Sequence, residues 1–239
     1  MLSRLIPARV ATWKGLIKIE TKLLKADFHI HTRYSMDCDT PLDKIISRCL
    51  EVGINCIAIA DHGTAEGALE VQRLAPFPVI VAEEILTPYG EIMGMFLKET
   101  IPSGLSVEEA ISQIRAQGGL VNIPHPFDMF RGFGRLDGRE LEKLIDQIDA
   151  MEVFNAREPF NGPSVKAQAF ARKYDIPGTA GSDAHTIGEI GHAYVEMPEF
   201  KGRDDFLHSL RAGRIVGRRT TPFIHFLSTW EKLKSVIKG

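Results

Sequence analysis

Short apolar runs alternate with amphipathic segments along most of the chain. After the first 25 residues the apolar runs have the length of buried strands, and the segments between them repeat apolar residues at helical spacing. Strands are predicted at 26–30, 55–60, 78–82, 91–97, 120–123, 150–154, 177–180 and 192–197. The alternation predicts an α/β fold with a mostly parallel sheet. The number of strands, about seven, favours a barrel or near-barrel over a small open sheet.

The predicted helices carry start and stop signals. The helix at 41–51 follows Thr40, a residue that can cap it, and Gly53 can end it. The helix at 106–117 opens with Ser106 and Glu109, the two members of a capping box. Further helices are predicted at 65–74, 138–145, 164–174, 203–212 and 228–237. Each connects two predicted strands, except the last two.

Composition describes an ordinary globular protein. The chain has 239 residues, of which 44% are hydrophobic and 25% charged, enough for one domain with a substantial core. Residues 1–25 are basic and lack the continuous apolar stretch of a signal peptide. They are interpreted as a lead-in to a single domain at 26–239, with an amphipathic membrane-surface or partner-binding segment as the alternative.

Charge, hydropathy and cysteine content exclude several classes. The net charge of −2 does not favour nucleic acid or an anionic membrane as a partner, and no apolar run approaches the roughly 20 residues of a membrane span. Cys38, Cys49 and Cys56 show no metal-binding or redox spacing. An odd number of cysteines suits reduced thiols, so a cytoplasmic location is expected.

Polar residues with metal-binding chemistry stand at the ends of most predicted strands. They are His29 and His31, Asp61 and His62, Glu83 and Glu84, His125, Asn155, and Asp183 with His185. In a parallel barrel the carboxyl ends of all strands lie on one face, so these residues should converge. Imidazole and carboxylate are the ligands of zinc, iron and manganese. The pattern therefore predicts a metal centre.

Spacing supports this prediction. Residues two apart in an extended segment point to the same side, so His29 and His31 can hold one ion, as can Asp183 and His185. A single carboxylate such as Glu84 can bridge two ions, and paired ions suit hydrolysis of phosphate esters. The other three histidines, His192, His208 and His225, are interpreted as structural or solvated. No nucleophile elbow, Walker loop or dinucleotide-binding loop is present in the sequence.

Six segments together resemble the PHP (polymerase and histidinol phosphatase) family. They are ADFHIHTRYSMD, IAIADHG, EEILTPYGE, IPHP, MEVFNAR and AGSDAH, and they follow the family's order from about Ala26 to Arg219. The resemblance implies a single-domain, distorted seven-stranded (β/α) barrel of TIM-like type. It also implies a centre of two or three divalent metal ions, Mn, Fe or Zn, and hydrolysis of phosphate esters.

The resemblance also implies a ligand set. His29 and His31 would bind a first ion with Glu84 and Asp183, and Glu84 would bridge to a second ion that His125 also holds. His62 and His185 would bind a third ion, to which Asp37 would contribute. Glu84 is preferred over Glu83 because Glu84-Ile85-Leu86-Thr87 matches the family's Glu-Ile-Ser-Thr pattern.

One position departs from the family's pattern. Many members carry a histidine for the second ion in a segment resembling His-Ile-Leu-Gly, where this chain has Glu91-Ile92-Met93-Gly94. Glu91 is a hard oxygen donor, so it can ligate, and it would favour manganese or iron over zinc. A solvated residue at the start of a strand is the alternative interpretation.

The expected reaction is hydrolysis of a small phosphate monoester. A water bridging the ions ionises near neutral pH and attacks phosphorus in line, and Asp183 or His185 helps to protonate the leaving group. Arginines suit bidentate capture of phosphate. Arg157 is the first candidate, because it follows Asn155 directly after a strand, and Arg33, Arg131 and Arg135 come next.

Three alternatives stay open at this point. A nuclease-like phosphodiesterase acting on nucleotides or oligonucleotide ends is not favoured, since the chain lacks a basic, aromatic-rich strand groove. A catalytically silent metal-binding domain is disfavoured by the near-complete ligand set. Metal-dependent amide or lactone hydrolysis of the amidohydrolase type also begins with HxH on a β/α barrel, and fold analogy alone does not exclude it.

Overall fold

The computed structural model describes residues 23–129, 136 and 138–220. Several sequence predictions fall outside these ranges: most of the basic lead-in, the helix at 228–237, His225, Arg131 and Arg135. Within the described ranges the chain forms a single α/β domain with nine strands and six helices. No helix in this part of the chain is both long enough and apolar enough to cross a bilayer.

The elements alternate much as the hydrophobic pattern predicts. The strands are β1 (Leu23–Ile30), β2 (Cys56–His62), β3 (Val79–Thr87), β4 (Gly90–Met95), β5 (Leu120–Ile123), β6 (Ala150–Asn155), β7 (Gly178–Gly181), β8 (Ala193–Pro198) and β9 (Arg214–Gly217). The helices are α1 (Leu42–Val52), α2 (Glu66–Leu74), α3 (Val107–Ala116), α4 (Gly138–Lys143), α5 (Asn161–Lys173) and α6 (Arg203–Arg211). The expected strands and helices of the described ranges are confirmed, with shifted ends.

The sheet has the order β7-β6-β5-β4-β3-β2-β1-β8-β9, which corrects the prediction of seven, mostly parallel strands. Half of the neighbouring pairs are antiparallel: β3–β4, β4–β5, β1–β8 and β8–β9. The reversal at β4 follows from the tight turn at 88–89, which leaves no room for the crossover that a parallel neighbour needs. The sequence analysis missed β9, which spans four residues and has no buried side chain to mark it.

Seven of the nine described strands nevertheless run in the same direction, all except β4 and β8. The pairs β1–β2, β2–β3, β5–β6 and β6–β7 are parallel, and the two antiparallel steps on either side of β4 cancel. The carboxyl ends of β1, β2, β3, β5, β6 and β7 therefore share one edge of the sheet. The predicted convergence of strand-end residues needs only this common direction.

The end of β7 returns to β1 and nearly closes the sheet into a barrel. The Asp183 amide donates to the His29 carbonyl at 2.7 Å, and the His31 amide donates to the Ala184 carbonyl at 3.0 Å. The buried Asp27 carboxylate reinforces this closure by accepting from the Ser182 amide at 2.9 Å. These contacts place the first and last polar strand ends side by side.

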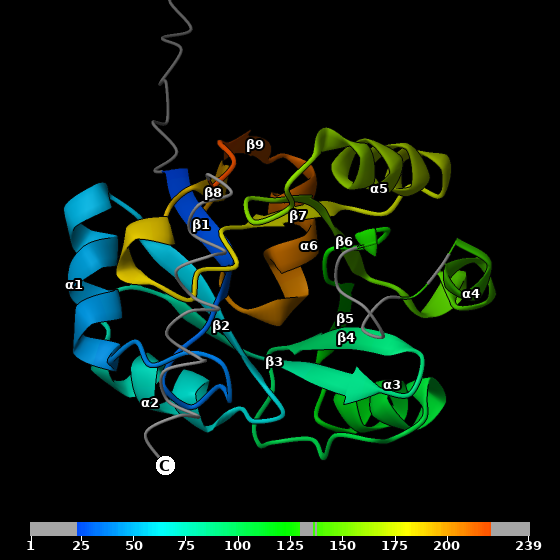
Figure 1. Ribbon diagram of the computed structural model, residues 1–239, viewed down its shortest axis with the longest axis horizontal. Helices are drawn as coiled ribbons and strands as arrows, with labels where there is room; N and C mark the ends of the chain where they lie inside the picture. Colours follow the sequence, from blue (N-terminus) through cyan, green and yellow to red (C-terminus); the bar gives the residue numbers. More distant parts are fainter. Residues whose placement is uncertain (1–22, 130–135, 137, 221–239) are drawn as a thin grey trace, which may run out of the picture.

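Two apolar layers hold the sheet in place. On the outer side, branched residues of the strands pack beneath α1, α2 and α3, which Figure 1 shows around the outside of the sheet. The inner side is lined by small residues such as Ala26, Ala58 and Ala82, together with larger ones such as Phe28. Phe206 of α6 meets Phe28 edge to face, with ring centroids 5.5 Å apart. Helix α6 thus fills the inner side near the amino ends of the strands, which leaves the carboxyl edge for the polar residues.

Local signals account for two of the helix ends. Gly53 ends α1 in the left-handed conformation at φ 75°, and Ser106 and Glu109 form the expected capping box of α3. The predicted cap of α1 by Thr40 is wrong. The Thr40 hydroxyl donates instead to the His185 carbonyl at 2.9 Å, because the loop after β7 passes close to it.

A carboxyl group is buried between the end of β6 and α5. Glu158 is 1% exposed, accepts a hydrogen bond from the Ser164 hydroxyl, and lies 3.3 Å from Arg219 Nη1. Burial raises the pKa of Glu158 from its ordinary value of 4.5 to about 7, against the opposing effects of Ser164 and Arg219. The protonated form is therefore the one that the fold favours.

The closure of the sheet predicts a cost for enlarging Gly181. A Cβ at this position would lie 2.8 Å from the His29 backbone nitrogen and would overlap the His29 side chain. We expect Gly181→Ala to lower the free energy of unfolding by roughly 1–3 kcal/mol, the usual cost of overpacking, measured by urea denaturation. Gly162→Ala is the control, since nothing lies within 4 Å of its Cβ position and alanine favours a helix. Equal stability of the two variants would contradict the close approach.

Burial of Glu158 predicts a pH-dependent stability. Its folded pKa lies above its ordinary value, so its contribution to stability is complete below pH 4.5 and is lost as the pH rises through about 7. The wild type should therefore lose stability between pH 5 and 7 as Glu158 ionises. The Glu158→Gln variant cannot ionise there, so we expect its free energy of unfolding to rise relative to that of the wild type over this range. Denaturant titrations of the metal-free proteins across this range measure the difference. Parallel pH curves for the two proteins would rule the effect out.

Candidate metal centre

All nine residues predicted to ligate metal lie together at the carboxyl edge of the sheet. Their donor atoms form four overlapping groups, in each of which the atoms lie within 4.8 Å of one another. The groups are His31, Asp37, His62 and His185; His29, Glu84 and His125; His29, His31 and Asp183; and His62, Glu84 and Glu91. Because the groups share members, they form one continuous cluster of imidazole and carboxylate donors.

Glu84 lies at the middle of the cluster. Its Oε2 atom is 3.2 Å from His29 Nε2, 3.4 Å from His31 Nε2 and 3.4 Å from His62 Nδ1. Its Oε1 atom is 3.0 Å from His125 Nε2. One carboxylate therefore faces four imidazoles, which is the geometry of a group that could bridge neighbouring cations.

The register of β3 decides between the two adjacent glutamates. Ile80 and Ala82 belong to the inner side of the sheet, and Glu84 follows at the same two-residue period. Glu83 points to the other side, where its Oε2 accepts from the Ile101 amide at 2.9 Å. The structure thus places Glu84, and not Glu83, among the donors.

A bulge in β1 turns His29 toward the same side. The pairing of β1 with β2 shifts register between Asp27 and Ile30, so both Phe28 and His29 face the inner side before His31 follows two residues later. The Nε2 atoms of His29 and His31 then lie 3.1 Å apart. Asp183 Oδ1 completes this corner, 3.3 Å from His31 Nε2.

Glu91 enters the cluster because β4 runs backwards. Its position pairs with Leu86, two residues beyond Glu84, so the amino end of β4 reaches the edge where the other strands end. Glu91 Oε1 lies 3.4 Å from His62 Nδ1, and its Oε2 lies 3.5 Å from His125 Nε2. The solvated alternative for this residue is not what the structure shows.

The remaining corner joins the loop after β1 to the loop after β7. Asp37 Oδ2 lies 2.9 Å from His185 Nε2 and 3.7 Å from His62 Nε2. The Ser35 hydroxyl donates to Asp37 Oδ1 at 2.8 Å, which holds the carboxylate toward the two rings. This corner is more exposed than the His29 corner, because Asp37 and His62 retain some exposure whereas His29 and His31 are fully buried.

Glu152 and Asn155 hold the buried donors from behind. Glu152 Oε1 lies 3.1 Å from His29 Nδ1, and its Oε2 accepts from the His125 amide at 2.7 Å. The Asn155 amide donates to Glu152 Oε2 at 3.0 Å and to Asp183 Oδ2 at 3.1 Å. The sequence analysis missed the role of Glu152, although an acidic residue within the apolar run AMEVF is the signal that could have found it.

Opposing charges shape the protonation of the buried corner. Burial disfavours a charged His29, but the Glu84 and Glu152 carboxylates outweigh it and raise its pKa to about 10. Burial, with the neighbouring His185 and His62, holds the pKa of His31 well below its ordinary value. Burial likewise opposes ionisation of Glu84, yet the surrounding imidazoles hold its pKa well below the usual range. The corner therefore favours an ionised carboxylate.

Two buried polar atoms in this corner indicate whether a cation would fit here. Within the described ranges, His31 Nδ1 and Glu84 Oε2 have no hydrogen-bond partner. A buried carboxylate oxygen without a donor is costly, and the nearest groups are imidazole nitrogens at ion-pair distance. A divalent cation between the rings and the carboxylates would satisfy this oxygen, so the donor set fits a metal ion.

Backbone strain accompanies two of the donor-bearing residues. His125 has φ 26° and Asp183 has φ 53°, a region that residues with a side chain rarely adopt. Such conformations persist where the surrounding contacts determine them, and they concentrate at functional sites. Here the His125 amide is held by Glu152 and the Asp183 amide by the His29 carbonyl.

The predicted phosphate-binding arginines lie in different places. Arg157 Nη1 contacts His185 Nδ1, and its Nε lies 3.4 Å from Glu189 Oε1, at the rim of the cluster. The Arg33 guanidinium lies over the Tyr34 ring, 5.7 Å from its centroid, and the residue is exposed. Of the two predicted arginines that the structure describes, Arg157 lies beside a candidate ligand, and Arg33 stays a prediction.

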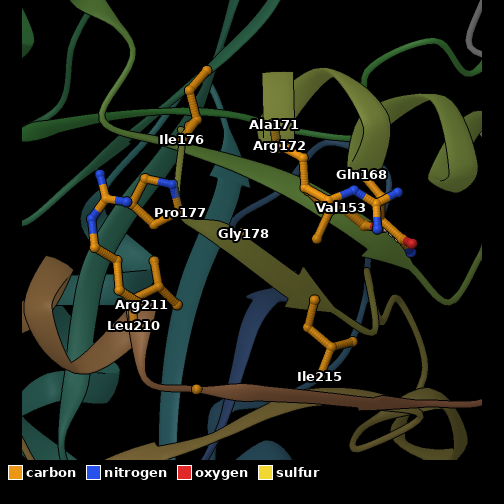
Figure 2. A pocket seen from close by; sticks show the side chains of 11 residues that line it. Val153, Gln168, Ala171, Arg172, Ile176, Pro177, Gly178, Leu210, Arg211 and Ile215 are labelled. Carbon is orange, nitrogen blue, oxygen red and sulfur yellow. Dashed lines mark hydrogen bonds between the residues drawn. The ribbon is translucent and has the colours of Figure 1, made fainter. Parts of the chain in front are cut away.

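A surface hollow of about 520 Å³ lies elsewhere, between α5, the start of β7, the end of α6 and β9. Figure 2 shows Arg211 on one side of it and Arg172 and Gln168 on the other, with Pro177 and Gly178 between them. Its lining includes none of the nine donors, and Pro177 and Gly178 precede or begin β7, away from its carboxyl end. The chemistry is concentrated in the cluster and not in this hollow.

Two family models match the chain. Residues 27–87 match the model described as PHP domain, and residues 165–215 match the model described as PHP-associated. The first range contains the donors of β1, β2 and β3, and the second contains Asp183 and His185.

Two curated proteins of an archaeon are similar to this chain in sequence. An uncharacterized protein of Methanocaldococcus jannaschii is 36% identical over 178 residues, covering 74% of this chain and 71% of its own. A second uncharacterized protein of that organism is 38% identical over 148 residues, covering 56% of this chain and 82% of its own.

Solved structures share the fold at low identity. A two-domain protein of Bacteroides vulgatus, described as containing a predicted PHP-like metal-dependent phosphoesterase, superposes with a TM-score of 0.66 at 16% identity. That match covers 82% of this chain but 65% of the Bacteroides chain, slightly less than two thirds. An amidohydrolase of Chromobacterium violaceum, solved with bound sulfate and no metal, gives a TM-score of 0.58 at 16% identity over 70% of this chain and 90% of its own. By the similarity of its sequence and the architecture that carries its clustered donors, the chain belongs to the PHP family.

Proposed function

We propose that the protein is a metal-dependent phosphoesterase that hydrolyses a small phosphate monoester. The observation that carries the proposal is the buried Glu84 carboxylate, which faces four imidazoles and lies beside further carboxylates. Membership of the PHP family and the names of the structural relatives support the same class of reaction. The near-neutral net charge continues to argue against a nucleic acid as the usual partner.

The overlapping donor groups suggest how two or three ions would be held. His29, His31, Glu84 and Asp183 would hold the first, and Glu84, Glu91 and His125 the second. His62, His185 and Asp37 would hold a third at the more exposed corner. With Glu91 in place of a histidine, the second position is richer in oxygen donors, so we propose manganese or iron ahead of zinc.

Bound ions would lower the pKa of a coordinated water and neutralise charge that develops on the phosphoryl oxygens. The protein's own residues would position the substrate. Arg157, already at the rim, is placed to pair with a phosphate oxygen, and its guanidinium suits a two-point contact. His185 lies at this rim, and the buried Asp183 lies beside it, with its Oδ1 atom 3.5 Å from His185 Nδ1. One of the two would donate a proton to the leaving oxygen.

The setting proposed for this activity is the cytoplasm. Cys38, Cys49 and Cys56 are all buried and none forms a disulfide. Burial raises the pKa of the Cys56 thiol to about 12, so it stays protonated and unreactive at neutral pH. These are structural thiols of the kind that a reducing compartment permits.

Removing one central imidazole should abolish turnover. We expect His31→Ala to reduce hydrolysis of an aryl phosphate by at least ~10³-fold with Mn, Fe or Zn supplied, because the first ion loses a ligand and its position. His208→Ala, a change to an exposed histidine of α6, is the matched control and should retain wild-type rates. Undiminished turnover by His31→Ala under metal-replete conditions would overturn the site assignment.

Removing the carboxylate behind His29 should weaken metal binding without removing a ligand. Glu152 fixes the His29 ring through Nδ1, and loss of such a partner commonly costs roughly 10–100-fold in metal affinity. We expect that range for Glu152→Gln in a competition titration with a fluorescent chelator. Glu142→Gln, at an exposed glutamate of α4, should bind manganese like the wild type. Wild-type affinity in Glu152→Gln would show that Glu152 does not orient His29.

A substrate panel identifies the reaction class. Aryl phosphate, bis-aryl phosphate, short oligonucleotides, and amide and lactone substrates would be assayed with each of the three metals. Faster turnover of the monoester than of the diester supports the proposal, and the reverse order would replace it with a phosphodiesterase. Turnover of only the amide or lactone would replace it with amidohydrolase chemistry. No turnover of any substrate by metal-loaded protein would indicate a silent metal-binding domain.

A further inference from the structure

The chain that follows β9 lies across the loop at the end of β6. This loop, residues 155–158, is here called the 155–158 loop. The Thr220 amide donates to the Ala156 carbonyl at 2.8 Å, and the Arg218 amide donates to the His192 carbonyl at 2.7 Å. Strands β9 and β6 are far apart in the order of the sheet, so the Thr220 bond joins two regions that strand pairing does not connect. The Arg218 bond extends the pairing of β8 with β9.

Arg219 makes most of this connection with one guanidinium. It donates to Asn161 Oδ1 at 2.8 Å, to the Glu158 carbonyl at 2.7 Å, to the Asn155 carbonyl at 3.3 Å, to Glu158 Oε2 at 3.3 Å and to Ser164 Oγ at 3.1 Å. The same group lies over the Phe154 ring, 5.1 Å from its centroid. Its side chain is 19% exposed, so these contacts are largely shielded from water.

The contacts require an arginine. The acceptors lie on the 155–158 loop and on α5, and they are reached by three different nitrogens of one planar fork. A lysine at this position has a single nitrogen and no flat surface to lie over Phe154. The guanidinium thus supplies more than a positive charge. Its fixed geometry determines where the 155–158 loop lies relative to α5.

The 155–158 loop in turn carries two residues to the metal centre. At its start, the Asn155 side chain bonds both Glu152 and Asp183. Two residues later, Arg157 contacts His185 and Glu189. The carbonyl groups that Arg219 holds belong to residues 155 and 158, on either side of Arg157. A shift of the loop would therefore move the Arg157 guanidinium away from the rim.

We infer that Arg219 is a positioning residue, which holds the 155–158 loop so that Arg157 faces the phosphate of the substrate. This inference rests on the proposed phosphoesterase function. Arg219 would affect the affinity for phosphate indirectly, by positioning Arg157. Arg219 itself contacts neither the candidate ligands nor the substrate in this account.

The test is a double-mutant cycle between Arg219 and Arg157 on the full chain loaded with manganese. The proteins are the wild type, Arg219→Ala, Arg157→Ala and the double variant, with Arg218→Ala at the exposed neighbouring position as control. The readouts are KM and kcat for an aryl phosphate, the affinity for inorganic phosphate by calorimetry, manganese affinity and the thermal midpoint. Arg219→Lys and added guanidinium chloride test whether the fork itself is needed.

We expect Arg219→Ala to weaken phosphate affinity and raise KM by roughly tenfold, the effect of losing one charged hydrogen bond. Manganese affinity should change much less. The double variant should bind phosphate no more weakly than Arg157→Ala alone, because the two residues act in series. Guanidinium should restore part of the lost affinity in Arg219→Ala, whereas Arg219→Lys should resemble Arg219→Ala and Arg218→Ala the wild type.

Each other outcome overturns a defined claim. Additive losses in the double variant would show that Arg219 does not act through Arg157. A lower thermal midpoint with unchanged phosphate affinity would show a purely structural role. If the wild type neither hydrolyses phosphate esters nor binds phosphate while it binds manganese, the proposed function fails and this inference fails with it. If the wild type is active and the Arg219 variants keep its phosphate affinity and KM, this inference fails and the proposed function stands.

Discussion

The backbone pairing between the end of β7 and β1 is the contact on which the site depends. Two hydrogen bonds, from Asp183 to His29 and from His31 to Ala184, draw the sheet into a near-barrel. Only then do the first and last polar strand ends lie close enough to share an ion. Gly181 leaves the space for this approach, and the strained Asp183 backbone follows from it. Closure of the sheet is therefore what brings the donors together.

The clustered donors impose an electrostatic constraint on the fold. Several carboxylates and imidazoles are buried together, and each would cost free energy if left unpaired in the interior. Ion pairs around Glu84 offset this cost, and Glu152 and Asn155 hydrogen-bond to donors of the cluster. This arrangement leaves Glu84 Oε2 without a hydrogen-bond donor, and a divalent cation would satisfy that oxygen. The cost of burying the donors and the capacity to bind metal have the same origin.

Family membership and the local geometry constrain the activity to different degrees. The shared architecture includes proteins described as phosphoesterases and one described as an amidohydrolase, so the fold alone does not select the reaction. Two features of this chain bear on the reaction: Glu91, which lies among the clustered donors, and Arg157 at their rim. Glu91 adds a hard oxygen donor and Arg157 suits a phosphate oxygen. Together with the near-neutral net charge, they are why we propose a small phosphate monoester first.

The sequence by itself determined the α/β alternation, most element positions and the identity of the nine clustered donors. It could do so because hydrophobic periodicity is local and because strands of common direction must end at one edge. Asp37 and Glu91, which do not stand at strand carboxyl ends, were expected only from the family resemblance. It could not determine that β4 reverses or that β1 bulges, since neither changes composition, yet these decide that Glu91 and His29 face the centre. It also missed Glu152 and Arg219, whose roles come from partners distant in sequence. Such contacts exist only once the chain is folded, because their geometry is set by the packing of whole elements and not by any local pattern.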